Sequence, residues 1–231
     1  MRSIGGRRRS PRRPDLVAQI DGDMARNDEE DMAETHPNAR LEIFCDGVFA
    51  IALTLLVIDI KVPASEGIST TRELWLALRH LGPSVFAFLL SFAIILITWV
   101  NHHRFLRLVN KSSALFVYAN GFLLLTVVFM PFPSALLGGY LLTDHAAPAV
   151  VIYTAVTAAQ AVGWILISAA ARGLAKDQKS AVLVRDYHRN GYFALVTYSL
   201  LALIALWFPL SIAVVTTVLW TYWLVYSSRA T

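Results

Sequence analysis

The sequence has little charge and almost no cysteine. Only 16% of its 231 residues are Asp, Glu, Lys or Arg, whereas soluble domains carry roughly 25%. The one cysteine, Cys45, has no partner within the chain, which excludes an intramolecular disulfide scaffold. Hydrophobic residues make up 56% of the chain, above the roughly 45–50% of soluble domains. These proportions exclude an ordinary soluble enzyme and predict an integral membrane protein.

The charge that the chain does have is concentrated at its N-terminus. Residues 1–39 hold 8 of the 16 acidic residues and 7 of the 20 Lys and Arg. Such a segment buries too little apolar surface to offset its ordering entropy, so we expect a disordered cytosolic tail. A basic arm for anionic lipid or nucleic acid is the alternative, but a tail that fixes topology accounts for the charges without a nucleic-acid partner.

Long apolar stretches follow between residues 40 and 228. Four of them are Phe44–Ile60, Pro83–Trp99, Ser113–Leu137 and Ala147–Ala171. A fifth, Gly191–Tyr226, has 36 residues and is divided by Pro209. Because a membrane-spanning helix needs about 20 residues, we predict an all-α domain of six transmembrane helices. Five is the alternative, if Pro209 only kinks one long helix.

The basic residues orient these six helices. With the N-terminus inside, the cytosolic segments hold 17 Lys and Arg and the outer connections hold 3. The outer three are Lys61, Arg72 and Arg79. Since cytoplasmic loops carry the excess of Lys and Arg, both termini are predicted to lie inside.

The first apolar stretch combines a carboxylate with an apolar stripe. At 100° per residue, Ile51, Leu55 and Ile58 fall within about 60° of each other, and Thr54 flanks them. Asp46 points about 120–180° away from this stripe. An intramembrane carboxylate costs about 2.5–3.5 kcal/mol at the bilayer centre, so Asp46 needs a partner or a function. By spacing alone, the stripe is typical of lipid contact or bundle packing.

Three segments in this region are distinctive. Arg40-x-x-x-Phe44-Cys45-Asp46 continues as an apolar run to Pro63, the second segment is Trp99–Phe105, and the third is Asn120–Tyr140, with Pro-Phe-Pro-Ser at its centre. In this order they resemble the first three helices of the transmembrane protein 175 potassium channel family. That family comprises the lysosomal potassium channel and its smaller bacterial relatives. Cys45 departs from the family motif R-x-x-x-F-S-D, and a thiol is a weaker hydrogen-bond partner than a hydroxyl.

The resemblance implies a specific architecture. Short bacterial members have six helices per chain and form tetramers in which the first helix lines the pore. The family lacks the T-V-G-Y-G filter of ordinary potassium channels, and this chain contains no such sequence. Carried over by position, the hydrophobic constriction falls on Ile51, followed by Leu55 and Ile58, and the polar pore layer falls on Thr54. The resemblance thus implies a homotetramer in a prokaryotic plasma membrane that conducts monovalent cations, K⁺ above all.

Asp46 is expected to hold the first helix against its neighbours. Its candidate partners all lie on the inner side of the membrane: Arg40, Trp99, His102 and His103. An ion or proton relay at Asp46 is the alternative. The adjacent His102 and His103 diverge by about 100° on a helix, so we expect no metal site there. No catalytic arrangement is apparent, and no cofactor is expected beyond the permeant K⁺ ions.

The sequence therefore favours a passive potassium-permeable channel over two alternatives. A secondary transporter requires inverted repeats and midplane binding groups, whereas no clear repeat is present and the midplane of the first helix is apolar. A non-conducting membrane interaction protein remains the second alternative, in which the stripe at Ile51 only meets lipid.

Overall fold

The computed structural model describes residues 38–229. Apart from one isolated bridge between Val109 and Ala175, the regular elements in this range are helices. The α-helices are α2 (Ala39–Leu55), α3 (Thr71–His80), α4 (Gly82–Leu106), α5 (Ala114–Phe129), α6 (Pro131–Tyr140), α7 (Ala146–Ala170), α8 (Gln178–Ile204) and α9 (Pro209–Arg229). Two short 3₁₀ helices, η1 (Leu56–Asp59) and η2 (Ser65–Gly67), follow α2. The all-α prediction is confirmed for these residues, whereas residues 1–37 of the expected tail lie outside the described range.

Four helical segments are long and apolar enough to cross a membrane. They are Ala39–Asp59, Gly82–Leu106, Ala114–Tyr140 and Ala146–Ala170. A shorter apolar helix covers Pro209–Trp223, and α8 begins with a charged first half before its apolar half starts at Gly191. The described residues thus include four candidate membrane spans, as expected of an integral membrane protein.

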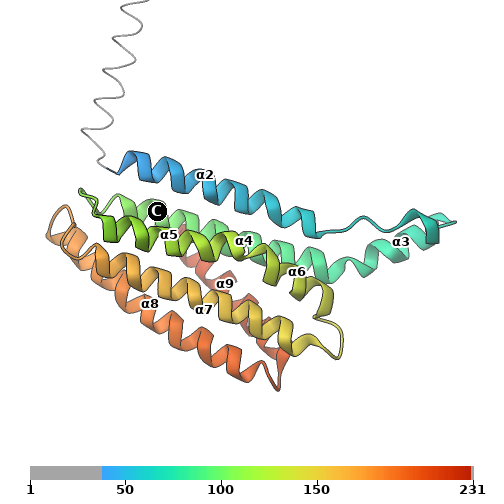
Figure 1. Ribbon diagram of the computed structural model, residues 1–231. Coiled ribbons are helices and arrows are strands. Elements are labelled where there is room, and N and C mark those ends of the chain that lie inside the picture. The colour runs from blue at the N-terminus through green and yellow to red at the C-terminus, as the bar shows by residue number, and fades with distance from the viewer. Residues whose placement is uncertain (1–37, 230–231) are drawn as a thin grey trace, which may run out of the picture.

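The long helices lie side by side in one bundle. Figure 1 shows α2 on one side, α8 on the other and α9 behind them, with α3 extending past one end. The α7 helix packs along α8 and also contacts α5, α6 and α9, so it is the central helix of the bundle. The α2 helix packs mainly against α4 and α5. Much of its surface is therefore not covered by the other helices.

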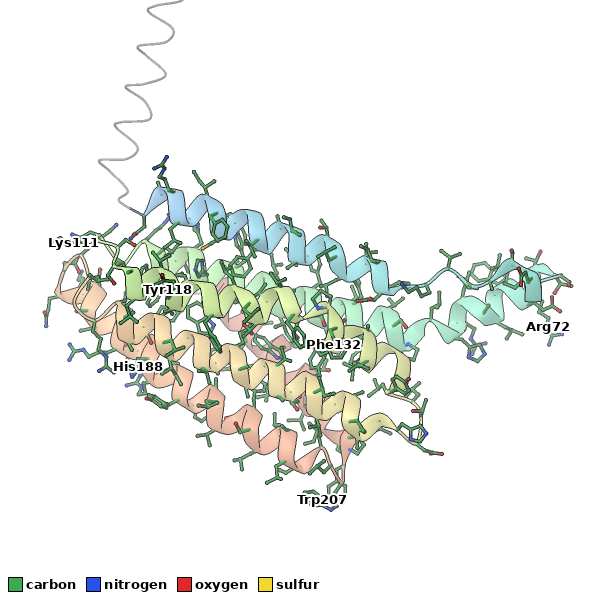
Figure 2. The ribbon with its side chains drawn as sticks, in the orientation of Figure 1. Arg72, Lys111, Tyr118, Phe132, His188 and Trp207 are labelled. Atoms are coloured by element: carbon green, nitrogen blue, oxygen red, sulfur yellow. The ribbon has the colours of Figure 1, made fainter. Side chains whose placement is uncertain are left out.

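The connections alternate between the two ends of the bundle. Lys111, between α4 and α5, lies at the end where α2 begins, and Arg72 and Trp207 lie at the other end (Figure 2). At the Lys111 end, Asn110 N–H donates to Leu174 O at 3.1 Å, which joins the α4–α5 and α7–α8 connections. Asn38 Nδ2 donates to Val109 O at 3.1 Å and attaches the start of α2 to the same place.

Prolines divide two of the apolar stretches. Pro131 is the first residue of α6, so the stretch predicted at Ser113–Leu137 is two consecutive helices, α5 and α6. Pro209 is the first residue of α9, which turns back along the bundle after residues 205–208 (Figure 1). A proline lacks the N–H that a helix interior requires but is tolerated in the first turn. The alternative of one long helix kinked at Pro209 is therefore wrong.

Several helix ends differ from those expected. The first helix begins at Ala39 rather than Phe44 and tightens into η1 before Ile60. The second continues through residues 100–106, because this polar segment contains no Gly or Pro to end it. The α3 helix was not predicted; it begins with a capping box in which Thr70 and Glu73 satisfy each other's backbone N–H groups.

A glycine lets α6 approach α4 closely. A Cβ atom at Gly138 would lie 2.8 Å from Ser84 Cα, which is backbone and cannot give way easily. A Cβ atom at the neighbouring Gly139 would meet nothing within 4 Å. The contact between α4 and α6 thus requires glycine at position 138 only.

Candidate pore-lining helix and its inner network

One face of α2 is exposed along its whole length. One stripe of exposed residues recurs every three or four positions along α2 and η1: Arg40, Phe44, Gly47, Ile51, Thr54 and Ile58, with Leu55 beside it. Ile51 is 60% exposed and Ile58 59%, although both are large apolar residues. Exposed apolar patches of this kind mark contacts with lipid, with another protein chain or with a ligand path.

The opposite face of α2 is buried in the main apolar core. Cys45, Phe49, Ala52 and Leu56 are each at most 1% exposed. Their spacing of three or four residues gives a second stripe that packs on α4 and α5. Cys45 therefore occupies a packing position, where its thiol behaves as a small apolar side chain.

Asp46 is bonded to Trp99. The indole Nε1 of Trp99, on α4, donates to Asp46 Oδ1 at 2.7 Å. Of the four partners expected for Asp46, Trp99 is the one that forms this hydrogen bond, and it lies 53 residues away in the sequence. The carboxylate thus faces the bundle, on the side of α2 away from Ile51.

His103 contacts a carboxylate that the sequence did not single out. Its Nδ1 lies 2.7 Å from Glu42 Oε1, an ion pair when the imidazole is protonated. The His103 ring also lies 6.2 Å from the Trp99 ring. Glu42 precedes Asp46 by four residues, so both carboxylates fall on one side of α2. That spacing was the available signal for Glu42.

His102 points into the bundle instead of toward Asp46. It is fully buried, and its Nε2 donates to Asn120 Oδ1 on α5 at 2.8 Å. Asn120 Nδ2 in turn donates to Phe116 O at 2.7 Å. The His102 ring packs against Phe49 with centroids 5.4 Å apart, which links α2, α4 and α5 at one level. The two adjacent histidines thus have separate partners on separate helices.

The structure therefore divides the predicted residues into two groups. Asp46, Trp99, His102 and His103 meet partners inside the bundle, and Cys45 lies with them in the core. The other residues lie on the exposed stripe: Arg40, Phe44, Ile51, Thr54, Leu55 and Ile58. Arg40, which we expected as a partner of Asp46, belongs to the exposed group. One side of α2 is thus fixed by polar and apolar contacts, while the other is left for a further contact.

Comparisons with known proteins identify the family. The model of a family described as endosomal/lysosomal potassium channel TMEM175 matches residues 40–131. A protein of Chamaesiphon minutus named potassium channel is 39% identical over 188 residues, which cover 79% of this chain and 92% of that protein. The chain belongs to the TMEM175 family.

Two further comparisons extend the match. A protein of Streptomyces collinus named potassium channel is 41% identical over 128 residues, 55% of this chain and 61% of that protein. A crystal structure of a lysosomal potassium-selective channel TMEM175 homologue from Chamaesiphon minutus matches with a TM-score of 0.71 and 38% identity. That match covers 83% of this chain and 98% of the other. The resemblance noted in α2, α4, α5 and α6 is confirmed as family membership, and the structural match extends it to most of the chain.

Proposed function

We propose that this chain forms a homotetrameric, potassium-permeable channel in the plasma membrane of a prokaryote. The support is its membership of a family of ion channels together with the bacterial relatives that are named potassium channels. The proposal depends on the exposed stripe of α2. The chain buries only one face of this helix, so the opposite face needs a contact outside the chain. Permeant K⁺ ions are the only ligand that this function requires.

In this proposal the stripe of α2 lines the pore. One helix cannot enclose a channel, but four copies around an axis can, each contributing one Ile51. A ring of apolar side chains at a narrow point excludes water and gates by dewetting. Ile51 would form the constriction, with Leu55 and Ile58 extending it toward the outer end. Conduction then requires the ring to widen.

Thr54 would supply the polar layer of the pore. Its hydroxyl donates to Ile51 O at 2.8 Å within α2. The bond uses the hydroxyl hydrogen and leaves the oxygen as an acceptor, which is the group that replaces part of a cation's hydration shell. A flexible ring of four such oxygens gives modest selectivity among monovalent cations.

The remaining helices would complete six spans per chain. Besides the four apolar segments, α8 contributes its apolar half and α9 returns across the bilayer. The end of the bundle that holds Lys111 would be cytosolic, since the α4–α5 and α7–α8 connections there, with the adjoining end of α4 and first half of α8, carry 8 Lys and Arg (Figure 2). These are Arg104, Arg107, Lys111, Arg172, Lys176, Lys179, Arg185 and Arg189. The charged tail and both termini then lie on the cytosolic side, and α3 lies outside.

Current recording separates this function from its alternatives. The purified chain is reconstituted in a planar bilayer with K⁺ on one side and Na⁺ on the other. A channel of this kind gives a current without any added substrate or co-ion and a reversal potential displaced toward the K⁺ equilibrium potential. A secondary transporter gives flux that saturates and depends on a coupled ion. A non-conducting interaction protein gives no current, and that result contradicts the proposal.

A further inference from the structure

Four of the eight buried side-chain atoms that lack a hydrogen-bond partner among residues 38–229 lie on α7, α8 and α9. They are Gln160 Nε2 on α7, Tyr198 Oη on α8, and Thr216 Oγ1 and Trp220 Nε1 on α9. Gln160, Tyr198 and Thr216 are at most 5% exposed. Buried polar atoms in proteins are nearly always paired with protein or with ordered water, so this concentration needs a chemical explanation.

Three of these atoms, those of Tyr198, Thr216 and Trp220, belong to one region of the bundle. The α8 helix ends, and α7 and α9 begin, at the Trp207 end (Figures 1 and 2). At about 1.5 Å per residue, Tyr198 and Thr216 both lie about 10 Å inside that end. The rings of Tyr198 and Trp220 stack with centroids 5.9 Å apart, so α8 and α9 meet there. Trp220 lies about one turn further in than Thr216.

Tyr153 connects α7 to the same region. It lies seven residues into α7, again about 10 Å from the Trp207 end. Its hydroxyl lies 3.0 Å from Ser91 Oγ on α4, so this pair is satisfied. Gln160 follows Tyr153 by seven residues on the same face of α7 and lies about 10 Å further into the bundle. The polar layer thus includes α4, α7, α8 and α9, and only part of it is paired.

The neighbouring threonines of α9 show that Thr216 is unusual. Thr217 donates to Ala213 O and Thr221 to Thr217 O, both at 2.8 Å, as threonines in apolar helices commonly do. Thr216 has the same option within its own helix and makes no such bond, although it is 1% exposed. Its hydroxyl therefore points to a partner elsewhere.

The chemistry of the group selects the ligand. Trp220 Nε1 and Gln160 Nε2 can only donate, whereas the two hydroxyls can donate or accept. N–H donors repel a cation, and no Lys or Arg is among these side chains to balance an anion. A molecule that accepts from the N–H groups and exchanges bonds with the hydroxyls meets every requirement, and water does so.

We propose that ordered water occupies the interior between α7, α8 and α9 and joins Tyr198, Thr216 and Trp220. The site lies within a single chain, apart from the exposed stripe of α2. It therefore does not depend on the function proposed for that stripe, and it can be tested whether or not the chain conducts.

Hydroxyl-radical labelling tests the site directly. A brief X-ray pulse splits bound water, and the radicals oxidise the side chains in contact with it, which mass spectrometry locates. After correction for intrinsic reactivity, we expect the reconstituted protein to be labelled several-fold faster at Tyr198 than at Phe105, which is fully buried. Thr216→Val should reduce labelling of Tyr198 several-fold, whereas the matched Thr217→Val should leave it unchanged. Equal labelling of Tyr198 and Phe105 overturns the proposal.

A double-mutant cycle tests the same site without labelling. If one water bridges them, Tyr198→Phe and Thr216→Val each lower the melting midpoint, and the double variant loses less than the sum. If neither hydroxyl is bonded to water, removing either one eliminates a buried unpaired polar group and raises the melting midpoint. Rises in both single variants, or losses that simply add, contradict a shared water.

Discussion

Trp99 Nε1 donates to Asp46 Oδ1 at 2.7 Å, on the side of α2 away from Ile51. The two side chains of α2 diverge by about 140° around the helix axis. The bond therefore fixes the rotation of α2 against α4, and with it the direction in which the exposed stripe points. Glu42, bonded one turn earlier to His103, supports the same orientation.

Removing the bond from Trp99 should weaken the bundle more than it alters ion preference. Hydrogen bonds to charged groups contribute about 1.5–3 kcal/mol, so we expect Asp46→Ala and Trp99→Phe to lower stability by about that much. The yield of the proposed tetramer, measured by size-exclusion chromatography with light scattering, should fall. Asp46→Asn is the matched control, because its amide oxygen still accepts from Trp99. A well-assembled Asp46→Ala tetramer with a changed reversal potential reverses this assignment.

Gly138 should tolerate no side chain. Gly138→Ala places a Cβ atom against Ser84 Cα and forces α6 away from α4, at a cost of about 1–3 kcal/mol. Gly139→Ala is the control, since its Cβ meets nothing and alanine favours the helix. Thermal melting in detergent should show a lower midpoint for the first variant and an unchanged or higher one for the second. Equal midpoints contradict the close approach of α4 and α6.

The start of α3 should be sensitive to acid. The N–H groups of Ser69 and Thr70 donate to Glu73, and these bonds hold the pKa of Glu73 below its ordinary value of 4.5. The cap is therefore complete above pH 4.5 and is lost as the pH falls through the lowered pKa. We expect high protection of the Ser69 and Thr70 amides from hydrogen exchange at neutral pH, and loss of it in Glu73→Ala. Protection that is identical in the two proteins contradicts the cap.

The helices could be predicted from the sequence because the bilayer sets their length. Apolar runs of about 20 residues located α2, α4, α7 and the combined α5 and α6, and Pro209 marked the start of α9. The α3 helix was missed because it is short and amphipathic, with charged residues at both ends. Thr70 and Glu73 have the spacing of a capping box, and this pattern could have predicted the start of α3.

The partners inside the bundle could be predicted only in part. Four candidate partners for Asp46 could be named from residue type and position, but the choice of Trp99 depends on how α2 and α4 rotate against each other. His102 pairs with Asn120 and His103 with Glu42 for the same reason. Periodicity also cannot separate a stripe that meets lipid from one that lines a pore, because apolar side chains suit both.

Ile51→Asn should increase conduction. An amide in place of the sec-butyl group hydrates the narrow point and lowers the barrier to ion entry, so single-channel current should rise several-fold. Leu200→Asn on α8 is the control, because Leu200 is also more than half exposed but lies on a helix that the proposal keeps away from the pore. A current that Ile51→Asn leaves unchanged removes Ile51 from the constriction.

The arrangement of four chains in the membrane tests the central claim most directly. A cryo-electron microscopy structure of the full chain in lipid nanodiscs gives the position of each α2 relative to the symmetry axis. We predict four α2 helices around one central axis, with Ile51 closest to it and Asp46 still bonded to Trp99 away from it. An assembly in which Ile51 faces lipid contradicts the pore proposed for α2.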